Sequence, residues 1–123
     1  MGISIEYINS IKNNDPAITH VRIQHAIYPK DGCALAEALK ENTHVSSVDL
    51  AYARIGDEGA CALAEVLKTN RTLINLHLAA NDIGDKGARA LAEALKTNST
   101  LNKLSLVSNS IGKETMLAFA ETL

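Results

Sequence analysis

The chain has 123 residues, of which 46% are hydrophobic and only 3% are aromatic, and its formal net charge is −2. These values fit one domain with a continuous apolar core, and the weak net charge argues against nucleic acid or an anionic membrane as the main partner. The sequence has no run of 18 apolar residues and no signal-peptide pattern, so we expect a cytoplasmic protein that binds no nucleic acid and no membrane.

A unit of 28 residues recurs along the chain. Residues 43–70 and 71–98 agree at 15 of 28 positions, residues 15–42 form an earlier copy, and residues 99–123 form a later copy that stops three residues short. A fixed period of this length is typical of a solenoid, in which each unit packs only against its neighbours. We therefore expect four repeats, 15–42, 43–70, 71–98 and 99–123, behind a separate N-terminal segment, 1–14.

The N-terminal segment is predicted to form a short amphipathic helix. Ser4 precedes Ile5, Ile8 and Ile11, which recur at near-helical spacing. Because the end of a solenoid exposes apolar side chains unless something covers them, we expect this helix to cap the first repeat. The turn formers of residues 13–16 are expected to end it.

Each repeat is predicted to begin with a short strand that has one buried face. Strands that recur with a helix between them pair in parallel. Asn81 and Asn109 end the following turns in the third and fourth repeats, where their amides can bond backbone groups, whereas Ala26 and Ala53 hold this place in the first two. The apolar strand positions are Ile18, Val21 and Ile23; Val45, Val48 and Leu50; Leu73, Leu76 and Leu78; and Leu101, Leu104 and Leu106.

The second half of each repeat is predicted to be a helix. Asp57 and Asp85 follow glycines and are predicted to be N-caps, while Pro29 suits a first helical turn. Small residues such as Gly59 and Gly87 would let the helix approach the strand closely. Lys-Thr-Asn is expected to close the helices at residues 68–70 and 96–98.

Two known families resemble this pattern. The frame Leu-x-x-Leu-x-Leu-x-x-Asn-x-Ile, followed by Gly-Asp-x-Gly-Ala-x-Ala-Leu-Ala-Glu-x-Leu, resembles a leucine-rich repeat of the 28-residue, ribonuclease-inhibitor-like type over residues 15–123. This resemblance implies an α/β fold, a right-handed βα solenoid with a parallel sheet on the concave face and helices on the convex face, used to bind proteins. Asn14, Asp15 and Pro16, together with the run at residues 36–42, are also similar to the repeat domain of tropomodulins, which cap actin filaments. The tropomyosin-binding and first actin-binding segments of that family have no counterpart here.

Outward strand positions are expected to stack in columns about 4.8 Å apart. One column contains His20, Ser47, Asn75 and Lys103, and the next contains Arg22, Asp49, His77 and Ser105. Tyrosine and arginine are favoured as interface anchors. The predicted partner-binding residues are Arg22, Asp49, Tyr52, His77 and Lys103. The alternative is a solvated face on which Arg22 and Asp49 only pair across strands.

Catalysis, metal binding and a cofactor are not expected. Asp49, His77 and Ser105 follow the order of a hydrolase triad on adjacent strands, but an open sheet offers neither a pocket nor an oxyanion hole. Ran GTPase-activating proteins have similar repeats, yet their catalytic residues match no position here. The sequence contains no nucleotide-binding loop motif. The spacing of its four histidines matches no Cys/His zinc-site pattern; they are His20, His25, His44 and His77.

Two pairs of recurring residues have simple interpretations. Cys33 and Cys61 occupy the same position in successive repeats. Because packed helices lie about 8–10 Å apart and a disulfide needs Cα atoms within about 7 Å, we expect free thiols. Glycosylation sequons begin at Asn70 and Asn98, at repeat junctions, and are interpreted as by-products of the repeat.

The fourth repeat departs from the others. It carries Leu117 at the outward position of Arg89, and Phe119 at the position of Leu91. Two interpretations stay open: a fragment of a longer array, or an end that pairs with another copy and buries Met116 and Leu117.

The sequence therefore predicts a protein-binding module that uses its concave face. One alternative is a tropomodulin-like, actin-associated domain, with actin as a possible partner. The other is a self-associating scaffold, and we expect a monomer or a weak homodimer through a solenoid end.

Overall fold

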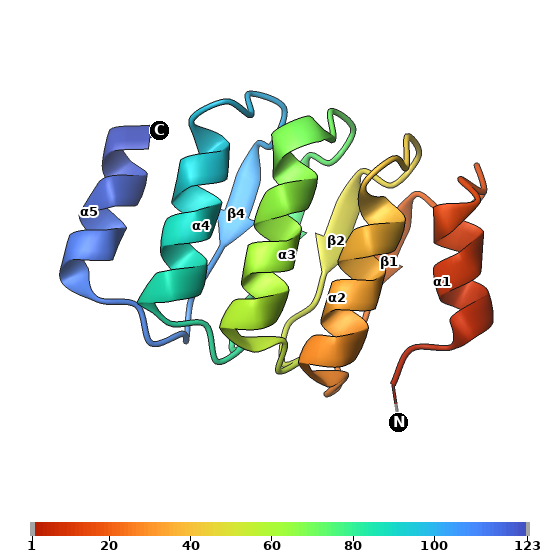
Figure 1. Cartoon of the computed structure of the whole chain (residues 1–123), viewed down its shortest axis with the longest axis horizontal. Coiled ribbons are helices and arrows are strands. Elements are labelled where there is room, and N and C mark those ends of the chain that lie inside the picture. The colour runs from red at the N-terminus through yellow and green to blue at the C-terminus, as the bar shows by residue number, and fades with distance from the viewer. Residues whose placement is uncertain (1, 123) are drawn as a thin grey trace.

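The computed structural model describes residues 2–122, in which helices and strands alternate. In chain order the elements are α1 Ile5–Lys12, β1 His20–Arg22, α2 Tyr28–Leu39, β2 Ser47–Asp49, α3 Gly56–Thr69, β3 Asn75–His77, α4 Asp85–Leu95, β4 Lys103–Ser105 and α5 Lys113–Thr122. The chain is thus a helix followed by four strand-helix units (Figure 1).

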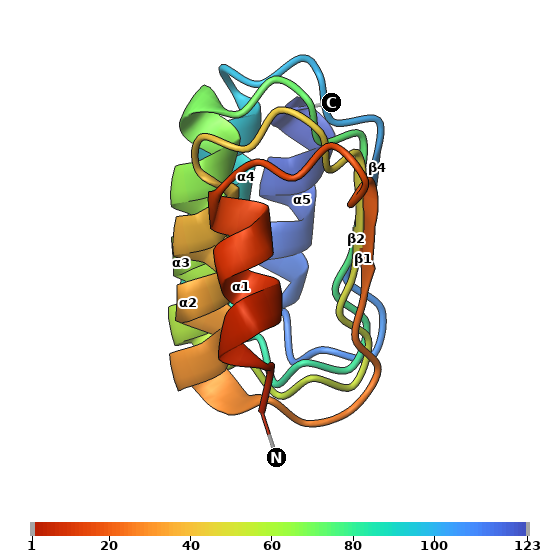
Figure 2. The same cartoon turned by 90° about the vertical axis from the view of Figure 1, so that its right-hand side faces the viewer.

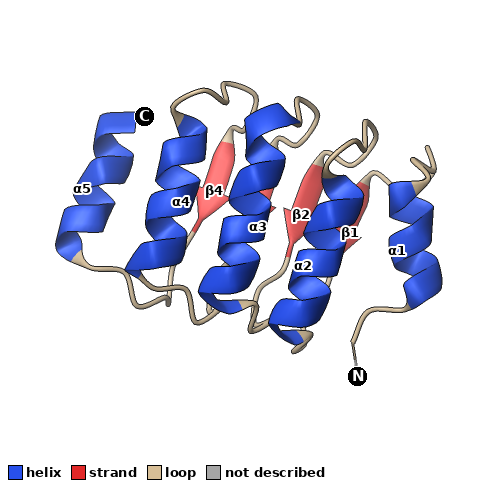
Figure 3. Cartoon of the chain, in the orientation of Figure 1, coloured by secondary structure: helices blue, strands red, loops and turns tan. Residues whose placement is uncertain are grey.

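The four strands form one parallel sheet in the order β1-β2-β3-β4. The sheet lies on one side of the molecule and the helices on the other, as Figure 2 shows end-on and Figure 3 shows by element type. The predicted α/β repeat solenoid is therefore confirmed. Register follows the sequence columns, with Val21 opposite Val48 and Val48 opposite Leu76.

The core lies between the two layers. Each strand is three residues long, and in the first three strands the middle residue is at most 1% exposed. This burial follows from the alternation of side chains along a strand. On the helix side, Gly87 permits a close approach, because a Cβ there would lie 2.9 Å from the Cβ of Ala60 on α3.

Helix α1 packs beside α2 at the start of the solenoid (Figure 1). The Ser4 hydroxyl accepts a hydrogen bond from the Tyr7 N–H, which confirms the predicted helix start. Ile11 is buried and Ile8 packs against the core, whereas Ile5 is 70% exposed, so the buried face of this helix does not include Ile5. A spacing of three residues falls 60° short of a full turn at each step, which places Ile5 about 120° from Ile11.

The two aspartates predicted to be N-caps have a different role. Asp57 is the second residue of α3, and its Oδ1 accepts hydrogen bonds from Gly84 N–H and Gly87 N–H of the next unit. Asp85 begins α4 and accepts in the same way from Gly112 N–H. These carboxylates therefore cap the helix entry of the following unit, and no side chain caps α3 or α4 at its own N-cap residue.

Candidate functional site

The candidate binding face is the outward side of the sheet, which we call the strand face. Register places Arg22 opposite Asp49, Asp49 opposite His77, and His77 opposite Ser105. Lys103 lies in the neighbouring column, opposite Asn75. The structure therefore brings three of the five predicted contact residues into one row and sets Lys103 beside them.

Tyr52 lies apart from this row. It follows β2 in a turn with a φ of 64°, and its side chain is 65% exposed. It lines a shallow hollow of about 330 Å³ at the edge where strands turn into helices, together with Arg54, Ala80, Asp82 and Ser108. Tyr52, the aromatic residue among the five predicted contact residues, therefore lies at this edge of the sheet.

Asp49 is held by neighbours other than the predicted arginine. Its Oδ2 accepts a hydrogen bond from Gln24 Nε2 at 3.1 Å, and its Oδ1 accepts one from the Ala51 N–H at 3.1 Å. The three ion pairs found among residues 2–122 lie at the C-terminal ends of α2, α3 and α4, each between a glutamate and the lysine three residues later. The alternative pairing of Arg22 with Asp49 does not form, although the two residues are register partners.

The geometry gives no support to a hydrolase triad. Asp49, His77 and Ser105 are consecutive register partners. Among the described residues, however, no hydrogen bond joins any two of these side chains. The described part of the chain also contains no group of three or more metal-ligating side chains that could hold an ion.

A buried asparagine ladder joins the units on the opposite edge, where helices return to strands. Asn70 Nδ2 donates to the carbonyls of Leu39 and Asn42, while its Oδ1 accepts from the N–H groups of Thr72 and Leu73. Asn42 and Asn98 make equivalent bonds one unit earlier and one unit later. From the sequence, Asn70 and Asn98 were placed at helix ends and in sequons and Asn42 was given no role, although the 28-residue recurrence of all three was the available signal.

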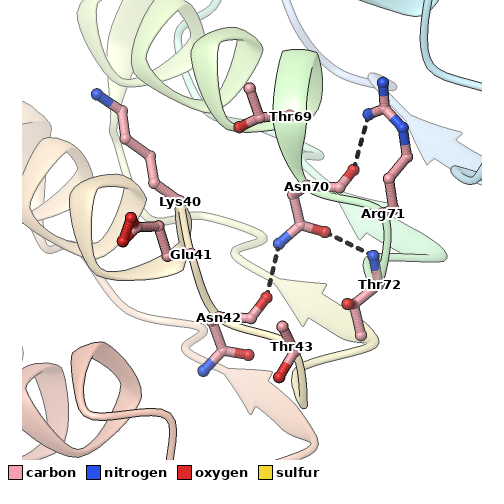
Figure 4. A pocket seen from close by; sticks show the side chains of 8 residues that line it. All are labelled: Lys40, Glu41, Asn42, Thr43, Thr69, Asn70, Arg71 and Thr72. Carbon is pink, nitrogen blue, oxygen red and sulfur yellow. Dashed lines mark hydrogen bonds between the residues drawn. The ribbon is translucent and has the colours of Figure 1, made fainter.

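The ladder borders a hollow of about 560 Å³ between successive units, shown in Figure 4. Its lining is Lys40, Glu41, Asn42, Thr43, Thr69, Asn70, Arg71 and Thr72. The Arg71 guanidinium donates to the carbonyls of Leu67, Lys68 and Asn70, so it closes the C-terminal end of α3. Because these polar groups already bond backbone, this hollow is a joint between repeats rather than a ligand site.

The two cysteines are free thiols on α2 and α3, and both are partly buried. Burial raises the pKa of the Cys33 thiol, and the neighbouring Glu58 and Cys61 raise it further. A raised pKa keeps the thiol protonated at neutral pH and lowers its reactivity as a nucleophile.

Comparison with known families identifies the fold more narrowly. The model of the TMOD/LMOD (tropomodulin/leiomodin) leucine-rich domain matches residues 4–114. The chain belongs to the TMOD/LMOD leucine-rich domain family. The tropomodulin resemblance found in the sequence is thus confirmed, whereas the ribonuclease-inhibitor-like repeat type gains no support.

Two solved structures of TMOD/LMOD type resemble the chain. One is leiomodin-1 actin-binding site 2, with a TM-score of 0.89 and 35% sequence identity over 98% of this chain and 73% of that chain. The other is the C-terminal domain of tropomodulin from Caenorhabditis elegans, which shares the fold at a TM-score of 0.66 and 18% identity, over 98% of this chain and 92% of that chain. No curated protein sequence gives a significant match. The family description names a leucine-rich domain and no catalytic activity.

The last unit of this TMOD/LMOD domain leaves an apolar groove. The groove has a volume of about 610 Å³ and lies between β4 and α5, where its lining includes Leu104, Leu106, Met116 and Phe119. Phe119 is buried, but Met116 is 49% exposed and Leu117 is 57% exposed. Within the described part of the chain, no helix has the length and apolar content of a membrane span.

Proposed function

We propose that this chain is an actin-binding module of the TMOD/LMOD type, built from a capping helix, residues 1–14, and four repeats, residues 15–123. The observation that supports it most is the likeness to leiomodin-1 actin-binding site 2, at 35% identity over 98% of the chain. At a TM-score of 0.89 the two backbones follow the same course, so the strand face of this chain corresponds in place to that of leiomodin-1 actin-binding site 2. A module with this partner works in the cytoplasm.

The proposed contact residues are Arg22, Asp49, Tyr52, His77 and Lys103. Arg22 and Lys103 are exposed on the outer strands, and His77 lies between them. Gln24 and Ala51 hold the Asp49 carboxylate, which places its charge beside His77. Side chains that are already ordered lose little conformational entropy on binding, so a held carboxylate is a good contact group.

Co-sedimentation of the purified chain with filamentous actin tests this proposal. We expect saturable binding that weakens about tenfold when Arg22 or His77 is changed to alanine. Glu93→Ala is the matched control, because Glu93 is exposed on α4 and pairs with Lys96, on the opposite side of the molecule. Absence of the chain from the actin pellet at micromolar concentrations would contradict the proposal.

A self-associating scaffold is the second candidate, because the groove between β4 and α5 leaves apolar side chains exposed. An exposed strand edge next to such a groove favours pairing with another chain. Light scattering over a concentration series distinguishes the two. The scaffold is supported if the mass of the parent chain rises with concentration while Leu117→Glu stays monomeric. A parent chain that is monomeric at every concentration would contradict the scaffold.

A further inference from the structure

Both glycosylation sequons of this chain begin at asparagines of the buried ladder. The acceptor pattern occurs at residues 70–72 and 98–100. A glycan is bulky and hydrated, so an asparagine that carries one lies at the surface of a folded glycoprotein. Asn70 and Asn98 are instead only 5% and 7% exposed. Folding therefore buries both acceptor side chains.

The amide nitrogen of Asn70 has no hydrogen to spare. Its Nδ2 donates to the Leu39 carbonyl and to the Asn42 carbonyl, both at 3.1 Å, and a side-chain amide carries only two such hydrogens. Its Oδ1 accepts from the N–H groups of Thr72 and Leu73 at 2.8 Å and 2.9 Å, which fixes the orientation of the amide. Figure 4 shows this side chain joined to the Asn42 carbonyl of the preceding unit.

Asn98 repeats this arrangement one unit later. Its Nδ2 donates to the Leu67 carbonyl at 2.8 Å and to the Asn70 carbonyl at 3.3 Å. Its Oδ1 accepts from the N–H groups of Thr100 and Leu101. Because the Asn70 carbonyl is one of these acceptors, the two sequons belong to one continuous set of hydrogen bonds that joins the first three units.

N-glycosylation needs the same nitrogen atom. The asparagine Nδ2 forms a bond to C1 of a lipid-linked oligosaccharide and loses one hydrogen as a proton, while the lipid pyrophosphate leaves with the electron pair of the broken C–O bond. Since an N–C bond is about 1.46 Å long, a sugar carbon in place of either Asn70 Nδ2 hydrogen would lie about 2 Å from a carbonyl oxygen. Even a weak C–H···O contact requires about 3.3 Å. The folded joint and the glycan therefore exclude each other.

The unfolded chain lacks this protection. In an extended chain neither asparagine is buried or bonded to another unit, so both amides are open to the transferase that modifies sequons in the secretory pathway. A glycan on Asn70 would separate the second unit from the first, and a glycan on Asn98 would separate the third from the second. Because each unit of a solenoid is stabilised by its neighbours, a chain modified at both sites loses the contacts that hold its inner units together.

We propose that the two sequons confine the folding of this chain to compartments that lack N-glycosylation. In the secretory pathway both asparagines are modified before the chain folds, and the modified chain stays unfolded. This inference does not depend on actin binding. It gives a cytoplasmic location a physical cause in two buried amides of the repeat itself.

The test directs the full chain, behind a cleavable secretory signal, into the secretory pathway of cultured mammalian cells. The parent is compared with the double variant Thr72→Ala and Thr100→Ala, which removes both sequons and keeps both asparagines. The two threonines give the joints only their backbone N–H groups, and no hydrogen bond of either hydroxyl occurs within residues 2–122. Made without the secretory signal in bacterial cytosol, both chains should fold and melt within about 2 °C of each other.

The two chains should differ strongly once they enter the secretory pathway. We expect at least about tenfold more folded double variant than parent in the medium, because a chain that cannot fold is retained and degraded. The retained parent should carry glycans on Asn70 and Asn98, detected by its loss of mass on treatment with an endoglycosidase. An inhibitor of lipid-linked oligosaccharide synthesis should restore secretion of the parent and leave the double variant unchanged.

An exposed sequon provides the matched control. Ala17 is exposed in the turn before β1, and Ala17→Asn creates an acceptor pattern with Ile18 and Thr19. The backbone N–H of residue 17 keeps its bond to the Asp15 carboxylate. Added to the double variant, this change should give a secreted, folded glycoprotein, because its glycan lies outside the joints.

Three results would overturn the inference. One is secretion of the parent in the same amount as the double variant, with or without glycans. Another is a glycan on Asn70 or Asn98 of a secreted chain that melts at the temperature of the unmodified protein. The third is retention of the double variant inside the cell, because a feature other than the sequons would then prevent folding in that compartment. The proposed function is unaffected by each of these results.

Discussion

The third and fourth units have the same leucine frame but bury it to different depths. Leu73, Leu76 and Leu78 of the third unit are at most 2% exposed. The matching Leu101, Leu104 and Leu106 of the fourth unit pack against the core but are only partly buried. An inner unit is covered by a neighbour on each side, whereas β4 has a neighbour on one side only. The sequence pattern therefore decides which side chains face inward, and the neighbouring units decide how strongly each one stabilises the fold.

The asparagine turns show the same difference. Asn81, after β3, is fully buried, and it bonds the Leu50 and Ala79 carbonyls and the Ile55 N–H. Asn109, after β4, makes similar bonds but is partly buried. Hydrogen bonds are strengthened where water is excluded, so the same residue stabilises an inner unit more than the last one.

The largest expected effect comes from truncating a strand leucine. Leu76→Ala should lower the free energy of unfolding by about 3–4 kcal/mol, because it opens a cavity in a fully enclosed site. Leu104→Ala should lower it by about 1–2 kcal/mol, because water can enter the partly open site. Urea unfolding followed by circular dichroism measures both. Equal losses would show that the fourth unit is covered in solution.

Removing a ladder asparagine should have the next largest effect. Asn70→Ala leaves the Leu39 and Asn42 carbonyls without their donor and the N–H groups of residues 72 and 73 without their acceptor. We expect a loss of about 2–3 kcal/mol. Asn109→Ala should lose about 1 kcal/mol, because water can replace its bonds at the open end. Urea unfolding midpoints compare the two variants, provided that the dependence of the unfolding free energy on urea is the same in both. A larger loss of stability in Asn109→Ala would contradict the expectation that the inner units are held more strongly than the last one.

The joint between the last two units should also depend on pH. The Gly112 N–H bonded to Asp85 lowers the pKa of that carboxyl below its ordinary value of about 3.9. A lowered pKa in the folded state means that the stabilisation is present above the unfolded-state pKa and is lost as pH falls through the folded-state pKa. Asp85→Asn should therefore be less stable than the parent chain at pH 7, and the difference should shrink as the pH falls below the unfolded-state pKa of the carboxyl. Thermal melts over a series of pH values below 7 check this, and a difference that stays constant or grows as the pH falls would contradict it.

Much of the fold could be predicted from the sequence, because its period is strict. The alternation around Val48 and Leu76 identified the buried strand positions. The sequence columns also paired β1 with β2 at a spacing of 27 residues, one less than the repeat length, and the register has this spacing. The role of Asn70 could not be predicted, because its donor reaches carbonyls that only the stacking distance between units brings near. Asp57 was misassigned for the same reason, since a Gly-Asp pair looks alike whether it caps its own helix or the next one.

The candidate site was only partly predictable. Columns such as Arg22, Asp49 and His77 follow from period and register. The positive φ of Tyr52 could not be predicted, because the turn sets it, and the matching residues of the next two units, Ala80 and Ser108, share only this backbone conformation. Both leucine-rich families considered share the 28-residue frame, so the frame alone could not separate them, and the match to the TMOD/LMOD family over residues 4–114 did so.

The smallest expected effect tests the outer surface of the last unit. Leu117 occupies the outward place that Arg89 holds in α4, and it is 57% exposed. Leu117→Glu should therefore change the free energy of unfolding by less than about 0.5 kcal/mol in the monomer. Arg89→Glu is the matched control in the inner unit and should behave alike, because both side chains point to solvent from equivalent positions. A loss above 1 kcal/mol for Leu117→Glu alone, growing with protein concentration, would mean that a second chain covers this end, and the last unit would then be as enclosed as the inner ones.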